Sequence, residues 1–186
     1  MRPVGRGQNP RGGRLFWLDM RSYRWPKPRQ YAIFWLHMSH TVTASSLIGR
    51  KDEKEKLGRA FASAEAEFVA VYGRRRVGKT YLVREFSGGA IRFELTGMHG
   101  VSMRDQLGNF ATALARAKGL EEKLQPPATW REAFGQLERH IESLGPAPAG
   151  GKHVVFLDEL PWLDTPRAKF CPALDHFWNS WASKRR

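Results

Sequence analysis

A glycine-rich loop between an apolar run and a helical pattern most constrains the fold of this chain of 186 residues. The apolar, partly β-branched run Phe68–Tyr72 predicts a buried strand, and a helix is predicted from Thr80 to Phe86. The loop follows the pattern G-x-x-x-x-G-K-[ST] and reads Gly73-Arg74-Arg75-Arg76-Val77-Gly78-Lys79-Thr80. Glycines let successive backbone N–H groups point at phosphate oxygens, and the following helix adds the positive end of its dipole. This order of elements predicts a P-loop that binds phosphate groups.

The side chains at the end of the loop have separate predicted roles. Lys79 would neutralise the β- and γ-phosphates of a nucleoside triphosphate and assist catalysis, and the Thr80 hydroxyl would bind Mg²⁺. Tyr81, the next residue, is included in the predicted binding segment. The three arginines at 74–76 either raise the positive potential around a polyanion or face solvent, because a P-loop binds through its backbone.

A second motif supplies the carboxylates that such a site needs. The apolar run Val154–Leu157 is followed by Asp158 and Glu159, which places two acids at the C-terminal end of a predicted strand. Ligands bind at this edge of open α/β sheets. We expect Asp158 to hold Mg²⁺ and Glu159 to orient or deprotonate the attacking water. The acidic pair favours water as the phosphoryl acceptor, with a small-molecule phosphotransferase as the alternative, and the chain lacks the Asn-Lys-x-Asp motif of GTPases.

Elsewhere the hydrophobic pattern alternates between strands and helices. Two further strands are predicted at 91–96 and 153–157, and the helix that begins after Ser102 has Asp105 at the capping-box position. Helices are predicted over 52–64, 102–118, 129–145 and 170–183. Strands separated by helices predict βαβ units, and therefore an α/β fold in which helices flank a parallel sheet.

The positive charge is concentrated in the N-terminal segment. The formal net charge is +13, and residues 1–37 contribute +7 of it through eight Arg and Lys against Asp19 alone. Basic residues mixed with aromatic ones can bind single-stranded nucleic acid, so a nucleic-acid-binding module is an alternative function. Because this segment has no sustained periodicity, residues 1–44 are predicted to be a disordered basic extension.

Composition and cysteine content indicate a globular protein of a reducing compartment. Hydrophobic residues make up 41% and charged residues 26% of the chain. Cys171 is the single cysteine, so no internal disulfide can form, and a cytoplasmic location is predicted. No apolar run approaches the roughly 18–20 residues that cross a bilayer, so no membrane partner is expected.

Taken together, the motifs resemble one known family. The segments Leu47–Arg50, Gly73–Thr80 and Phe156–Asp164, with His176–Trp181 after them, are similar to the prokaryotic "archaeal ATPase" family of STAND-type, AAA+-related P-loop ATPases. The resemblance covers about residues 45–183. It implies ATP and Mg²⁺ as ligands. Hydrolysis is expected to drive a conformational switch, and a homo-oligomer or a protein effector is the expected partner.

The resemblance also implies roles for residues outside the two main motifs. It places Ile48, Gly49 and Arg50 near the adenine. It also places Thr96 where a polar residue restrains the catalytic glutamate in AAA+ proteins; a threonine that merely ends a strand is the alternative.

The chain departs from the family pattern at its C-terminus. In AAA+-type domains, a strand with a polar sensor residue lies between the P-loop strand and the Asp-Glu strand, but this chain ends at Arg186 before such a strand appears. The resemblance therefore predicts that residues 45–186 form the N-terminal part of an ATP-binding domain, truncated after the Asp-Glu strand and the helix that follows it. The two central strands would then lack a neighbour, which invites aggregation, and the chain alone would have a compromised site.

Overall fold

The computed structural model describes residues 13–17, 31–37, 50–73, 76–147, 151–165 and 167–185. The strands are β1 (Gly13–Trp17), β2 (Tyr31–His37), β3 (Glu67–Gly73), β4 (Ile91–Thr96) and β5 (His153–Asp158). The α-helices are α1 (Lys51–Ala62), α2 (Lys79–Ser87), α3 (Met103–Ala117), α4 (Trp130–Ser143), α5 (Leu160–Leu163) and α6 (Phe170–Ser180). Short 3-10 helices follow α2 (η1, Gly88–Ala90) and α6 (η3, Ala182–Lys184). None of the helices in these ranges is long and apolar enough to span a membrane.

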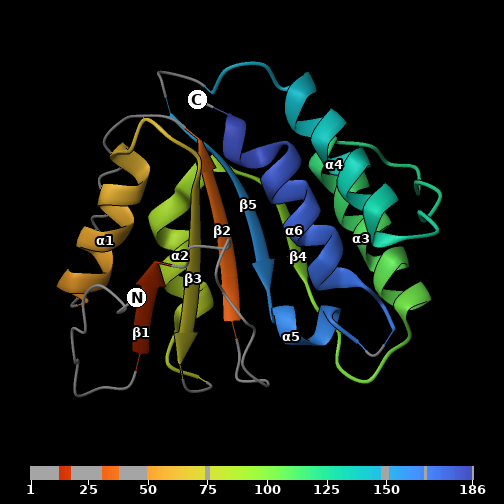
Figure 1. Cartoon of the computed structure of the whole chain (residues 1–186), viewed down its shortest axis with the longest axis horizontal. Coiled ribbons are helices and arrows are strands. Elements are labelled where there is room, and N and C mark those ends of the chain that lie inside the picture. The colour runs from red at the N-terminus through yellow and green to blue at the C-terminus, as the bar shows by residue number, and fades with distance from the viewer. Residues whose placement is uncertain are drawn as a thin grey trace.

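The five strands form one mixed sheet in the order β1-β3-β2-β5-β4 (Figure 1). β4 and β5 pair in parallel, and β2 pairs antiparallel with both β3 and β5, so that Phe34 lies opposite Val69 on one side and Phe156 on the other. Since both neighbours of β2 run against it, β3 and β5 point in the same direction. Their following loops therefore leave from the same edge of the sheet, where ligands bind in α/β folds.

The α/β class predicted from the sequence is confirmed, but the middle of the sheet differs from the prediction. β1 and β2 lie within residues 1–44, for which disorder was predicted, and both pair antiparallel with β3. The predicted gap between the P-loop strand and the Asp-Glu strand is occupied by β2. β2 can take this place because the aromatic and branched residues of Tyr31–Leu36 favour an extended backbone. There it satisfies the hydrogen-bonding groups of β3 and β5 at once.

Helices cover both faces of this sheet. In β5, Val154 and Phe156 join an apolar cluster with α1 and α2, whereas Val155 and Leu157 join a larger cluster with α3, α4 and α6. All six residues of β5 are buried, as expected of a strand that is covered on both faces. Figure 1 shows α3, α4 and α6 gathered at the right of the view, with α1 at the opposite side of the molecule. The result is a three-layer arrangement of helices, sheet and helices.

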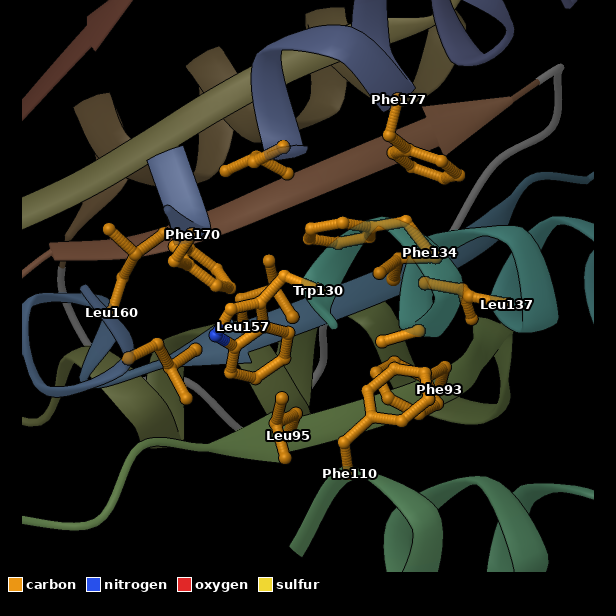
Figure 2. Packing of buried hydrophobic residues seen from close by; sticks show 14 of the residues in the cluster. Phe93, Leu95, Phe110, Trp130, Phe134, Leu137, Leu157, Leu160, Phe170 and Phe177 are labelled. Atoms are coloured by element: carbon orange, nitrogen blue, oxygen red, sulfur yellow. The ribbon is translucent and has the colours of Figure 1, made fainter. Parts of the chain in front are cut away.

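The larger cluster is built around one tryptophan. Figure 2 shows Trp130 lying among Phe134 and Phe170, which come from helices, and Leu95 and Leu157, which come from the two parallel strands. Trp130 is 1% exposed. This contact between helices and strands holds α4 and α6 over the sheet.

The helix starts agree with the sequence signals. Ser102 accepts a hydrogen bond from the Asp105 backbone N–H, and the Asp105 carboxylate accepts one from the Ser102 N–H, which makes a capping box. Thr129 caps α4 by accepting the Glu132 N–H at 3.2 Å. The cap predicted at Ser102 is confirmed, and Thr129 caps α4 in the same way.

A buried lysine joins the start of β5 to α1. The Lys152 Nζ donates hydrogen bonds to the Ala60 carbonyl at 2.7 Å and to the Glu65 carbonyl at 2.9 Å, and the residue is 2% exposed. Burial lowers the pKa of Lys152 to about 8, and the negative charge of Glu67 only partly opposes this shift. A neutral amine still has two N–H groups for the two carbonyls.

This lysine makes stability depend on alkaline pH. Between the folded pKa of about 8 and the ordinary value of 10.5, the native state binds fewer protons than the unfolded state. The free energy of unfolding should therefore rise with pH across this window. We expect Lys152→Met to flatten the rise, whereas Lys123→Met, a change at an exposed position, should keep it. Urea unfolding followed by circular dichroism between pH 7.5 and 10.5 measures this, and equal slopes in the two variants would contradict the prediction.

Candidate functional site

The glycine-rich loop joins β3 to the N-terminus of α2, as the sequence predicts. α2 begins at Lys79, with Gly78 as its N-cap at a φ of 74°. This left-handed conformation suits glycine, and Arg76 in the same loop has a φ of 59°. Val77 is half-buried, whereas Tyr81 on α2 is 55% exposed. Arg74 and Arg75 lie outside the described residues.

A hydrogen bond connects this loop to the acidic end of β5. The Thr80 hydroxyl donates to the Asp158 Oδ2 at 2.9 Å, although 78 residues separate them in the chain. The Asp158 Oδ1 accepts the Glu159 backbone N–H at 3.0 Å, and Asp158 is 9% exposed. The Asp158 carbonyl accepts the Gly97 N–H at 2.9 Å, which ties the end of β5 to the end of β4. The two residues predicted as Mg²⁺ ligands are thus brought together and fixed.

Lys79 lies in the electrostatic field of the acidic pair. Burial lowers the pKa of Lys79, while the negative charges of Glu159 and Asp158 raise it and the positive charge of Arg50 lowers it again. The net direction is downward. Two cations and two carboxylates therefore converge at the start of α2, a charge arrangement suited to a polyanion and its counter-ion.

Arg50 reaches the glycine-rich loop from the start of α1. It is the N-cap of α1 and has a φ of 53°. A Cβ added at Gly78 would lie 3.5 Å from the Arg50 Nη2, so the Arg50 guanidinium is close to the loop. Ile48 and Gly49 were predicted to lie near the adenine together with Arg50, but they are outside the described residues. The position of the three residues near the adenine therefore stays a prediction.

Glu159 has an unusual backbone and a specific side-chain partner. Its φ of 49° and ψ of 43° are left-handed, and it is the N-cap of the short helix α5. The indole Nε1–H of Trp162 donates to the Glu159 Oε2 at 2.8 Å. Thr96 lies opposite Asp158 in the sheet, and its carbonyl accepts a hydrogen bond from Asn109. Among the described residues, the hydrogen bond that restrains the Glu159 carboxylate thus comes from Trp162 rather than from Thr96.

No role for Trp162 was predicted from the sequence. The spacing could have indicated this role, because a hydrogen-bond donor three residues after Glu159 lies on the same side of a helical turn as Glu159. The segment Leu160–Leu163 is too short to show helical periodicity, and Pro161 near its start reads as a break.

The site offers few metal ligands of its own. No group of three or more His, Cys, Asp or Glu side chains that could hold a metal occurs within the described part of the chain. Thr80 and Asp158 provide two neighbouring oxygen donors. This donor set fits Mg²⁺, which keeps several waters and is bound through one or two protein oxygens together with substrate phosphates.

Comparisons with known proteins give one short match. No family model matches the chain, and no solved structure matches it. Over 39 residues, 21% of this chain, it is 46% identical to a protein of Methanocaldococcus jannaschii that is named an uncharacterized ATP-binding protein. The match covers 66% of that protein, just under two thirds of its length.

Proposed function

We propose that this chain binds ATP with Mg²⁺ at residues 73–80 and that Glu159 directs a water molecule to the γ-phosphate. The observation that carries the proposal is the 2.9 Å hydrogen bond between Thr80 and Asp158. It joins a phosphate-binding loop to an acidic strand end, which are the two parts that phosphoryl transfer from a nucleotide requires. The name of the archaeal relative supports ATP as the nucleotide.

Each residue of the site has a distinct task in this proposal. The backbone N–H groups of the loop and the N-terminus of α2 would bind the phosphates, and Lys79 would neutralise their charge. Thr80 and Asp158 would hold the metal ion, which supplies charge neutralisation between the phosphates when it is bound. Glu159 would orient the attacking water and accept its proton.

The use of the released energy is a further part of the proposal. The resemblance to STAND-type ATPases supports a conformational switch as the outcome of hydrolysis, in a homo-oligomer or with a protein effector. A small-molecule phosphotransferase would share the loop and the metal ligands. The two reactions differ in the acceptor, so phosphate release from ATP in the absence of any other acceptor would favour hydrolysis.

Removing the Lys79 amine tests the nucleotide site. We expect Lys79→Ala to weaken ATP binding about 100-fold, because charge-assisted contacts to phosphate are lost at a partly buried position. Isothermal titration calorimetry with Mg²⁺ and ATP measures the Kd. Lys118→Ala is the matched control, since Lys118 is exposed at the end of α3. Equal ATP affinity in Lys79→Ala and in the unaltered protein would contradict the assignment of the loop.

A further inference from the structure

We infer that Trp162 is a positioning residue that holds Glu159 in its working orientation through the indole N–H. This inference rests on the proposed function, because it concerns the group that would direct the attacking water. It adds a residue that neither the glycine-rich loop nor the acidic strand end contains.

The hydrogen bond between Trp162 and Glu159 uses one oxygen of the carboxylate. The indole Nε1–H donates to one carboxylate oxygen, Oε2, at 2.8 Å, which leaves the other oxygen without this partner. A carboxylate with one oxygen fixed and the other available can orient a water molecule in one direction. Hydrogen bonds to ionised acceptors are stronger than those between neutral groups, so this contact limits the rotation of the Glu159 side chain.

The backbone of Glu159 is held in a left-handed conformation. Left-handed conformations cost non-glycine residues free energy and persist where the surroundings enforce them. The backbone of Gly97 is one such constraint, because a Cβ built there would lie 2.5 Å from the Glu159 carbonyl oxygen. The short helix α5 is thus pressed against the end of β4. This close packing fixes the position of the Glu159 Cα, from which the side chain extends.

Trp162 is itself held by neighbouring residues. The fully buried Gln106 donates from Nε2 to the Trp162 carbonyl at 2.8 Å and to the Met98 carbonyl at 2.7 Å. The Trp162 ring also meets the His99 ring edge-on, with centroids 3.8 Å apart. Gln106 lies on α3, and His99 lies in the connection between β4 and α3. They hold the indole in place, as a residue that positions another side chain requires.

The direction of the effect follows from the charges at the site. After burial, the charge of Glu159 has the largest effect on the pKa of Lys79, so the Glu159 carboxylate lies near the start of α2 while it is bonded to Trp162. The bonded carboxylate is therefore close to the phosphate-binding loop. Loss of the indole N–H should slow turnover and leave ATP binding unchanged.

The first experiment detects the hydrogen bond without nucleotide. The seven tryptophans give seven indole signals in a ¹H–¹⁵N correlation spectrum, and Trp162→Phe identifies the one from residue 162. Glu159→Ala should shift that signal and speed its hydrogen exchange. The Trp181 indole donates to Glu142 at 2.9 Å elsewhere in the fold, and its signal should not move. An unchanged Trp162 signal in Glu159→Ala would overturn the inference, whatever the chain does with ATP.

The second experiment measures turnover. We expect Trp162→Phe, which keeps an aromatic ring against His99, to lower kcat for ATP hydrolysis about tenfold and to leave the Kd for ATP within about twofold. In a Glu159→Gln background the same change should have no further effect on kcat, because Trp162 acts through the carboxylate. Trp181→Phe removes an equivalent indole–carboxylate bond far from the loop and should leave kcat unchanged.

The results for Trp162→Phe can contradict the positioning role of Trp162 without contradicting the proposed ATP site. An unchanged or raised kcat in Trp162→Phe would overturn the positioning role, as would an equal loss of kcat in the Glu159→Gln background. If the unaltered protein neither bound nor hydrolysed ATP, the proposed function would fail, and the indole signals would still report whether Trp162 restrains Glu159.

Discussion

Replacing Glu159 with glutamine is expected to lower kcat for ATP hydrolysis by at least about 100-fold, since proton transfer by a positioned side chain contributes roughly 10²–10⁴-fold. Glutamine keeps the shape of the side chain and an oxygen for the Trp162 indole, but it cannot accept a proton from water. The Kd for ATP should remain within about threefold, because the backbone loop, Lys79 and the metal ligands are intact. Phosphate release under saturating ATP measures kcat, and calorimetry measures the Kd.

Glu122→Gln is the control for this substitution, because Glu122 is an exposed glutamate far along the chain from both motifs. It should leave both constants unchanged. Full turnover in Glu159→Gln would assign the activation of water to another group. A parallel loss of ATP affinity would instead mean that Glu159 supports binding rather than the chemical step.

Trp130→Ala is expected to cost about 3–5 kcal/mol of the free energy of unfolding. The Trp130 ring lies 4.7 Å from the Phe170 ring and 6.2 Å from the rings of Phe110 and Phe134, measured between centroids. Truncation would leave a cavity where α3, α4 and α6 meet the sheet. Domains of this size are stable by about 5–15 kcal/mol, so the variant should unfold at a much lower urea concentration.

Trp178→Ala is the matched control for the core substitution. Trp178 is half-buried and makes one edge-on ring contact, with Phe68 at 5.3 Å between centroids. A smaller loss, about 1–2 kcal/mol, is expected because less apolar surface is withdrawn from water. Urea titrations followed by far-UV circular dichroism give both values. A larger loss at Trp178 than at Trp130 would show that the core is centred elsewhere.

The local parts of the fold and of the site were predictable from the sequence. The strand that precedes the loop, the helix that begins at Lys79 and the strand that ends at Asp158 each have a short-range pattern. The predicted cap at Ser102 also depends on neighbouring residues alone. In these segments propensity, hydrophobic spacing and capping chemistry agree with one another, which makes them readable without tertiary information.

The long-range parts were not predictable in the same way. The place of Tyr31–His37 between β3 and β5 depends on partners far along the chain, and no local pattern specifies which strands it joins. The approach of Arg50 to Gly78 depends on how α1 packs against the sheet. The Trp162 bond depends on the left-handed turn at Glu159, and a single sequence does not reveal that conformation at a glutamate.

The position of β2 has a consequence for how the protein folds during synthesis. Trp35 lies opposite Phe68, 33 residues later in the chain, and opposite Val155, 120 residues later. Trp35 therefore leaves the ribosome 120 residues before Val155, its partner in the second strand. Contacts with such sequence separation form slowly, because the loop-closure entropy must be lost before the pairing compensates for it. Until β5 emerges, the edge of β2 that pairs with β5 is unpaired and can bind other chains. A chaperone that shields this edge during synthesis should therefore raise the yield of folded protein.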